Sequence, residues 1–175
     1  MRIWHLDFDV NEFENLQWVN LDIKEIQTYD GRPKSEGWIP RQVKRMYDRD
    51  FSNAPGLSSH IPVFDRVAVE KLGEYLQGVT EVLPLDCNDG EFFAINVIEV
   101  LDCIDYNDSE YKSFSDGSIM RFIKYVFNKE IVSGKHIFKI IDEPLARPFV
   151  SDEFKERVEE SNLVGFKFEL AWQSE

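Results

Sequence analysis

The sequence predicts an α+β fold, with a mainly antiparallel sheet and two or three short helices, as a single domain over residues 1–175. Several short segments alternate between apolar and polar residues, as half-buried strands do. Two apolar runs flank an Asp-Gly pair, which is a strong signal for a β-hairpin. Only two segments combine a capping residue with helical apolar spacing. Many strands with few helices favour the α+β class over alternating βαβ units.

The N-terminal third is expected to contain strands and irregular chain. Residues 3–8 are rich in aromatic and β-branched side chains, so they are predicted to form the opening strand. A second short strand is expected within residues 18–26, and the Asp-Gly-Arg-Pro sequence at 30–33 predicts a turn. Residues 34–59 have no regular pattern and contain prolines, which indicates a long surface segment with at most one short helix.

A helix is predicted from Asp65 to about residue 77. Aspartate is a favoured N-cap residue, because its carboxylate can accept a hydrogen bond from a backbone amide of the first turn. Val69, Leu72 and Leu76 then fall on one helical face. The apolar runs 79–85 and 92–100 follow, joined by Asn-Asp-Gly, and they are predicted to pair as a hairpin.

The C-terminal part is predicted to hold three strands and one helix. The strands are expected at 119–127, 136–141 and 165–172. In the last strand, the side chains expected to face inward are Phe166, Phe168, Leu170 and Trp172. Ser151 is expected to cap a helix over residues 152–160, with Phe154 and Val158 as its inner stripe.

The net charge of the chain is -13, from 20 basic and 33 acidic side chains. This excess of acids argues against a nucleic-acid-binding surface, which needs many Lys and Arg residues, and against binding to anionic membranes. It favours solubility and the capture of a basic partner, although a high acid content by itself also fits an ordinary acidic protein. No apolar run is long enough to span a membrane. Acids at positions 7 and 9 interrupt any secretion signal, so a cytoplasmic location is expected.

The histidines and cysteines show no metal-binding or cofactor-binding pattern. His5, His60 and His136 have no zinc-ligand spacing, and neither Cys87 nor Cys103 belongs to a C-x-x-C pair. We therefore expect no metal, no cofactor and no enzymatic activity, and we expect both cysteines to be free thiols that pack as small apolar residues.

Two catalytic alternatives compete with this interpretation. Ser58 and Ser59 precede His60, but a catalytic pair is defined by geometry rather than by adjacency in sequence, and no G-x-S-x-G motif is present. A small hydrolase with paired carboxylates remains open as an alternative. It would need two acids at a defined separation, one of them with a raised pKa through burial.

Two segments carry opposite charges. Residues 99–116 hold six acids and one base, a balance of -5, whereas residues 32–49 hold six bases and two acids, a balance of +4. The two segments could be solvated surfaces that face each other. The functional interpretation is that the acidic segment, predicted to be rich in turns as far as Gly117, docks a basic protein. Its predicted partner-binding residues are Asp102, Asp105, Asp108, Glu110 and Asp116.

A series of short runs carries a resemblance to a known family. The runs are Trp38-Ile39-Pro40, Pro62-Val63-Phe64, Glu81-Val82-Leu83-Pro84-Leu85, Leu101-Asp102-Cys103-Ile104-Asp105, Phe149-Val150-Ser151-Asp152-Glu153-Phe154 and Leu163-Val164-Gly165-Phe166-Lys167-Phe168. In their order and spacing, the chain resembles the immunity protein family numbered eleven of bacterial polymorphic toxin systems. The resemblance spans residues 38–168.

The resemblance implies a protein that binds and neutralises a cognate toxin, and we expect it to do so by covering the toxin's active site or substrate surface. It supplies no catalytic residues to carry over. The alternatives are the carboxylate-dependent hydrolase and a regulatory interaction module unrelated to toxins. A toxin gene beside this one would favour the first reading. The oligomeric state is left open.

Overall fold

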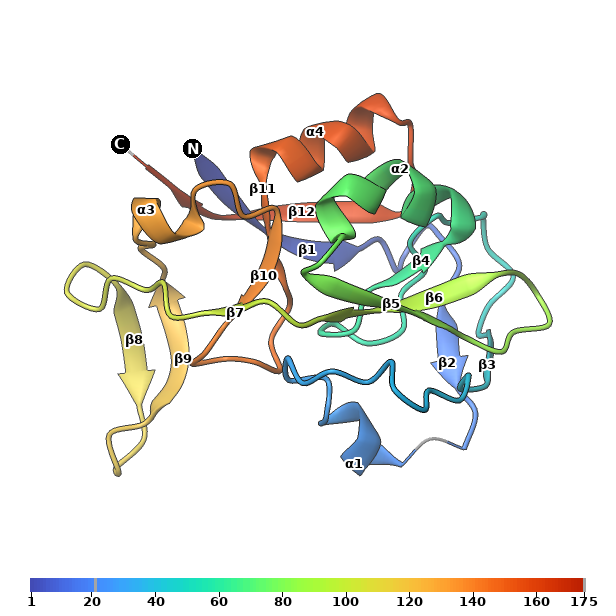
Figure 1. The fold of residues 1–175 in the computed structure, drawn as a ribbon, viewed down its shortest axis with the longest axis horizontal. Helices are drawn as coiled ribbons and strands as arrows, with labels where there is room; N and C mark the ends of the chain where they lie inside the picture. The colour runs from blue at the N-terminus through green and yellow to red at the C-terminus, as the bar shows by residue number, and fades with distance from the viewer. Residues whose placement is uncertain (21, 175) are drawn as a thin grey trace.

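In the computed structural model, residues 1–20 and 22–174 are described (Figure 1). The helices are α1 (Ile23–Ile26), α2 (Arg66–Leu76), α3 (Lys129–Val132) and α4 (Asp152–Glu160). The strands are β1 (Arg2–Phe8), β2 (Leu16–Trp18), β3 (Val43–Arg45), β4 (Val63–Asp65), β5 (Thr80–Pro84), β6 (Phe92–Val97), β7 (Val100–Leu101), β8 (Glu110–Ser113), β9 (Ile119–Lys124), β10 (Ile137–Ile140), β11 (Phe149–Ser151) and β12 (Phe166–Gln173). Within the described residues, no helix is long and apolar enough to cross a membrane.

The strands form four sheets, and most of the pairs are antiparallel. The largest sheet has the order β12-β1-β11-β10-β7, and only β10 and β7 run parallel in it. β4, β6 and β5 make a three-stranded antiparallel sheet, while β2 pairs with β3 and β8 pairs with β9. The predicted α+β class with a mainly antiparallel sheet is confirmed.

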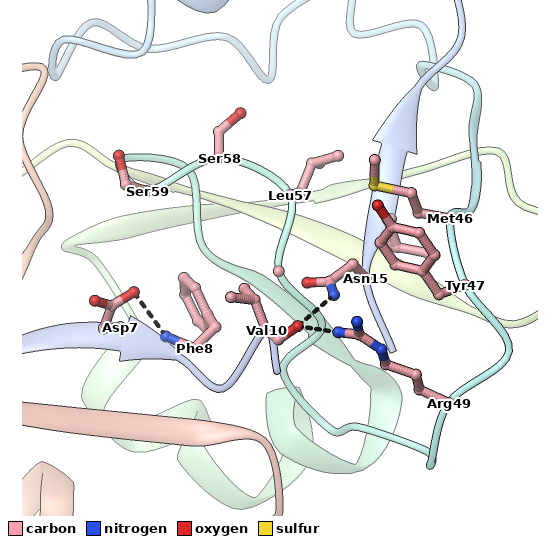
Figure 2. A pocket seen from close by; sticks show the side chains of 12 residues that line it. Asp7, Phe8, Val10, Asn15, Met46, Tyr47, Arg49, Leu57, Ser58 and Ser59 are labelled. Atoms are coloured by element: carbon pink, nitrogen blue, oxygen red, sulfur yellow. Dashed lines mark hydrogen bonds between the residues drawn. The ribbon is translucent and has the colours of Figure 1, made fainter. Parts of the chain in front are cut away.

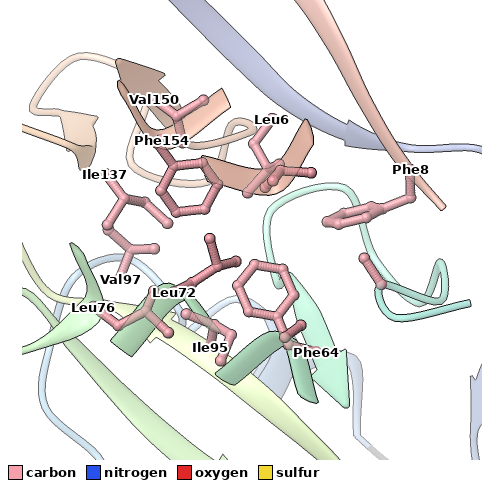
Figure 3. Close-up of a cluster of buried hydrophobic side chains, with 13 residues drawn as sticks. Leu6, Phe8, Phe64, Leu72, Leu76, Ile95, Val97, Ile137, Val150 and Phe154 are labelled. Carbon is pink, nitrogen blue, oxygen red and sulfur yellow. The ribbon is translucent and has the colours of Figure 1, made fainter. Parts of the chain in front are cut away.

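The main core lies where α2 and α4 pack together over the sheets (Figure 1). Figure 3 shows Phe64 from β4, Leu72 from α2 and Phe154 from α4 pointing toward one another. Each of these side chains is fully buried. Burying a large apolar side chain contributes roughly 1.5–3 kcal/mol, so this cluster is a principal source of stability.

A second core is built largely from aromatic rings on the other side of the large sheet's central strands. Phe138 of β10 stacks on Phe149 of β11, with their ring centroids 5.7 Å apart. Phe127 meets Phe149 edge to face at 5.2 Å, and Trp172 of β12 packs on Phe127 at 5.8 Å. Such ring pairs stabilise beyond their area of contact, and they tie the strands to the chain that follows β9.

The elements with strong local signals form where they were predicted. The Asp65 carboxylate accepts a hydrogen bond from the Ala68 amide at 2.7 Å and caps α2. The Ser151 hydroxyl accepts one from the Phe154 amide at 3.2 Å and caps α4. β5 and β6 pair as the predicted hairpin. Capping residues and turn residues act over a few positions, so the sequence reveals them directly.

The predicted strand within residues 18–26 is wrong. β2 already ends at Trp18, and α1 follows at Ile23–Ile26; Leu21 lies outside the described residues. The side chain of Asp22 accepts a hydrogen bond from the Lys24 amide at 2.9 Å, which starts the helical turn. Ile23 is 70% exposed, so the apolar pattern that suggested a strand does not report burial here.

Residues 34–59 are mostly irregular, as expected; they contain no helix, and their only strand is β3. Two smaller expectations need correction. The described helices number four rather than two or three, because α1 and α3 are single turns too short to leave a periodic pattern. Leu170 is 47% exposed rather than inward-facing, because the register of β12 shifts opposite Ile3 and Trp4 and interrupts the alternation.

Trp38 anchors the long irregular segment to the three-stranded sheet. Its indole Nε1 donates to the Pro84 carbonyl oxygen at 2.9 Å, and its ring packs on the core cluster that contains Leu83 and Leu85. The ring is only partly buried, so Trp38→Ala should lower the free energy of unfolding by roughly 2 kcal/mol. Ile39→Ala, at a 66% exposed position, should change it by less than about 0.5 kcal/mol. Denaturant melts measure both, and an unchanged melt for Trp38→Ala would contradict this role.

Candidate partner-binding surface

The loop between β7 and β8 carries three of the predicted partner-binding residues. Asp102 and Asp108 are exposed, and Asp105 is partly buried. The Asp105 carboxylate accepts a hydrogen bond from the Asn107 amide at 3.0 Å, so it shapes the turn as well as bearing charge. No hydrogen bond or ion pair to another described residue holds the carboxylates of Asp102 and Asp108. Both carboxylates are therefore available to a partner.

The other two predicted residues lie in a hairpin rather than in a continuous run of turns. Glu110 begins β8, which pairs with β9 at one end of the molecule, away from α2 and α4 (Figure 1). Asp116 lies in the turn of this hairpin, where its carboxylate accepts hydrogen bonds from the amide and the hydroxyl of Ser118 at 2.9 and 2.6 Å. These hydrogen bonds lower the pKa of Asp116. The expectation that turns extend as far as Gly117 is wrong for residues 110–113.

β9 dilutes the negative charge of the hairpin. Lys124 lies opposite Glu110, and Arg121 lies opposite Lys112. Residues 110–124 therefore contain three bases and two acids, and the excess of acid is confined to the loop at 102–109. The local balance of -5 counted along the sequence does not correspond to one surface in space.

A further acid joins the loop from a distant part of the chain. β7 and β10 run parallel, with Leu101 opposite Ile140, and this pairing brings the residues that follow both strands together. The Tyr106 hydroxyl donates to the Asp142 carboxylate at 3.0 Å. Burial and this carboxylate raise the pKa of Tyr106 to about 12. We call Asp102, Asp105, Tyr106, Asp108 and Asp142 the acidic surface.

Three of the six bases in the basic segment, residues 32–49, pair with nearby carboxylates. Arg32 pairs with Asp30, and Arg41 pairs with Glu25. Arg45 pairs with Glu14 at 2.8 Å. Half of the positive charges of residues 32–49 are thus neutralised by nearby carboxylates, whereas no ion pair among the described residues neutralises the acidic surface.

A hollow of about 450 Å³ lies elsewhere, beside the irregular segment (Figure 2). Val10, Met46, Tyr47 and Leu57 line it, and the Arg49 guanidinium donates to the Val10 carbonyl oxygen across it. Ser58 and Ser59 lie at its edge, as Figure 2 shows. This hollow is the candidate place for the Ser-His alternative.

The serines of this hollow are not arranged with His60 for catalysis. The Ser58 hydroxyl accepts a hydrogen bond from the Trp18 indole at 3.4 Å, while His60 Nε2 lies 3.1 Å from the Ile26 carbonyl oxygen. Among the described residues, no hydrogen bond joins His60 to either serine. The geometry therefore gives no support to a Ser-His pair.

Two buried carboxylates line a second hollow of about 290 Å³, where the paired-carboxylate alternative would need them. Glu14 accepts from the Ser52 amide at 3.2 Å and pairs with Arg45. Asp65 accepts from the Ala68 amide and from the Asn53 side chain, at 2.7 and 2.9 Å. Three of the four carboxylate oxygens thus accept hydrogen bonds within the fold and the fourth pairs with Arg45, which favours a role in folding over a role in hydrolysis.

The remaining candidate ligands are dispersed. Across residues 1–20 and 22–174, no group of three or more His, Cys, Asp or Glu side chains is arranged to hold a metal ion. His5 is buried in β1 against Phe149, and His136 Nδ1 lies 3.0 Å from the Ser151 hydroxyl. Both cysteines are free, as predicted, and burial raises the pKa of the Cys103 thiol to about 12.

The model of the immunity protein family Imm11 matches residues 84–172 of the chain. The matched residues make up just over half of the chain. The chain belongs to the Imm11 family. No curated protein matches it.

The Imm11 match begins at the end of β5 and runs to the last strand. It includes the whole acidic surface, from Asp102 to Asp142. The resemblance noted from the sequence is confirmed as to family, although its runs before Pro84 lie outside the matched residues.

The role of Asp105 in its turn can be separated from its charge. In this Imm11 protein, Asp105→Ala removes the acceptor for the Asn107 amide and should lower the free energy of unfolding by about 1 kcal/mol. Asp108→Ala removes an equal charge from the same loop without losing a described hydrogen bond, and it should change stability by less than about 0.5 kcal/mol. Thermal melts of the two variants make the comparison. Equal losses would contradict the turn role of Asp105.

Proposed function

We propose that this protein binds a cognate toxin and neutralises it by covering the toxin's active site or substrate surface. Membership of the Imm11 family is the observation that carries the proposal. The acidic surface supports it, because its charges are not consumed by internal ion pairs among the described residues. Tyr106 lies within it and is 39% exposed. Tyrosine is enriched where protein interfaces bind most strongly.

The proposed partner presents a basic surface. The net charge of -13 accelerates its capture, and the carboxylates of Asp102, Asp108 and Asp142 provide the complementary charge at contact. If the toxin acts on nucleic acid, its substrate cleft is lined by Lys and Arg, and these carboxylates occupy the place of phosphates. The immunity protein then competes directly with the substrate.

Co-expression tests the proposal. The polypeptide encoded immediately upstream is expected to end in a toxic C-terminal domain, and that domain should stop bacterial growth when it is produced alone. Production of this chain in the same cells should restore growth, and the two proteins should co-purify. A toxic domain that remains toxic beside normal amounts of folded immunity protein would overturn the proposal, as would a neighbouring product without toxicity.

A further inference from the structure

The loop that joins β10 to β11, residues 141–148, is held at many points along its length. At its start, Asp142 accepts from the Tyr106 hydroxyl at 3.0 Å, and Glu143 accepts from the Tyr125 hydroxyl at 2.8 Å. The two tyrosines come from the β7–β8 loop and from the chain after β9. The first half of the loop is thus tied to two other segments. We call residues 141–148 the β10–β11 loop.

A buried lysine holds the middle of the β10–β11 loop. Lys139 is 2% exposed, and its ammonium donates to the Pro144 carbonyl oxygen at 2.9 Å and to the Tyr29 carbonyl oxygen at 2.6 Å. No carboxylate of the described residues pairs with it. Burying an ammonium without a counter-ion is unfavourable, and the two carbonyl contacts offset only part of that cost. The structure thus retains a costly group that fixes this loop.

The end of the β10–β11 loop is equally constrained. The Arg147 guanidinium pairs with Asp7 of β1 at 2.8 Å and with Glu169 of β12 at 2.9 Å. The Pro148 carbonyl oxygen accepts from the Leu6 amide at 2.9 Å. The eight residues of the loop are therefore contacted by β1, by β12 and by the segments that carry Tyr106, Tyr125 and Lys139.

Two large aliphatic side chains of this constrained loop face solvent. Ile141 is 49% exposed and Leu145 is 42% exposed, while the other six residues of the loop are buried or partly buried. Asp142 of the acidic surface lies between them in sequence. The loop thus presents apolar side chains and negative charge together, on a backbone that is already ordered.

We propose that the β10–β11 loop is the element that enters the toxin, with Leu145 and Ile141 contacting an apolar cleft floor and Asp142 meeting a basic rim. This inference rests on the proposed function and specifies its contact surface. An interface binds more tightly when the entropic cost of ordering it is met during folding rather than during binding. This loop is already ordered in the free protein. A few buried anchors carry most of the binding energy of such an interface.

The charge around the loop favours a toxin over a second copy of this chain. Two copies meeting through this loop would bring their acidic surfaces together, and like charges in close contact oppose association. A basic partner instead gains from Asp102, Asp142 and the negative net charge. We therefore assign the loop to a basic partner, and sedimentation of the free protein must give a monomer.

Calorimetric titration of an active-site-inactivated form of the upstream toxin domain tests whether Leu145 and Ile141 contact the toxin. Leu145→Ser and Ile141→Ser should each raise Kd roughly 10- to 100-fold while the melting curve stays close to wild type. Leu170→Ser is the matched control, because Leu170 is 47% exposed on β12, and its Kd should equal that of wild type. Tight wild-type binding with an unchanged Kd for Leu145→Ser would overturn this inference and leave the proposed function standing. No binding by wild type would overturn the proposed function itself.

Hydrogen exchange tests whether the loop is ordered in advance. The amides of Ile141, Glu143 and Ala146 donate hydrogen bonds to backbone carbonyls, so they should exchange slowly in the free wild-type protein. They should exchange faster in Tyr106→Phe, which loses only the hydroxyl that holds Asp142. Lys139→Met should speed exchange further and should accelerate dissociation of the toxin complex several-fold with little change in association rate. If Lys139→Met does not fold, Tyr106→Phe alone decides the outcome. Fast exchange in the free wild-type protein would contradict the proposal.

Discussion

Reversing Asp102, Asp108 and Glu110 to lysine should slow association with the toxin domain by roughly 10- to 100-fold. All three side chains are exposed, and no hydrogen bond or ion pair to another described residue fixes their carboxylates. The fold should therefore survive the change, and the melting curve should stay near that of wild type. Long-range attraction between exposed charges is screened over about 8 Å at physiological ionic strength, so the variant should also lose most of the salt dependence of its association rate.

A matched control carries the same change in net charge on another surface. Three exposed acids of α4 lie far along the chain from the loop between β7 and β8: Glu153, Glu156 and Glu160. Their reversal to lysine should slow association much less, because steering depends on where the charge lies as well as on its total. Stopped-flow mixing at two salt concentrations measures both variants. Equal slowing by the two triple variants would mean that net charge alone attracts the toxin.

The free energy of unfolding of wild type, measured relative to that of Lys139→Met, should rise by about 3 kcal/mol between pH 8 and pH 10.5. Burial lowers the pKa of Lys139 from 10.5 to about 8. In this window the unfolded chain holds a proton on Lys139 that the folded chain has released, so raising the pH favours the folded state. Cysteines and tyrosines also ionise at high pH, but they are present in both proteins, and their contribution cancels in the difference.

Urea denaturation at several pH values measures this linkage. Lys167→Met removes an exposed lysine from β12, and its stability should keep a constant offset from wild type across the same range. A constant offset for Lys139→Met as well would mean that Lys139 titrates normally and is not desolvated in the folded state.

Local signals in the sequence were enough to predict α2, α4 and the β5–β6 hairpin. In each case the decisive residue acts within a few positions: Asp65 and Ser151 cap helices, and Asp-Gly turns the hairpin. The helical turn α1 was missed although Asp22, its cap, is readable. Apolar residues on either side favoured a strand, and the exposure of Ile23 is a tertiary property that no local pattern reveals.

The acidic surface could be predicted only in part. Asp102, Asp105 and Asp108 are close in sequence and share one loop. Asp142 joins them through the parallel pairing of β7 with β10, and β7 has only two residues, too few for a periodic signal. Arg121 and Lys124 of β9, which offset the acids, lie outside residues 99–116, so a charge count along that segment does not include them.

The contacts by which Lys139 holds the β10–β11 loop left no signal in the sequence. Lys139 lies in an apolar strand, where a lysine is normally expected to reach solvent, yet it is almost fully buried. Its acceptors are two backbone carbonyls, one of them 110 residues away in sequence. Every residue has a backbone carbonyl, so residue type does not indicate which carbonyls accept from Lys139. Only the folded structure reveals the contact.

Neutralisation by binding is tested by calorimetric titration of wild-type protein into the inactivated toxin domain, with activity measured on the active domain in parallel. We expect a saturable one-to-one complex, and toxin activity should fall in proportion to the fraction of toxin bound. Loss of toxicity without a complex, or through a substoichiometric amount of this protein, would contradict neutralisation by binding.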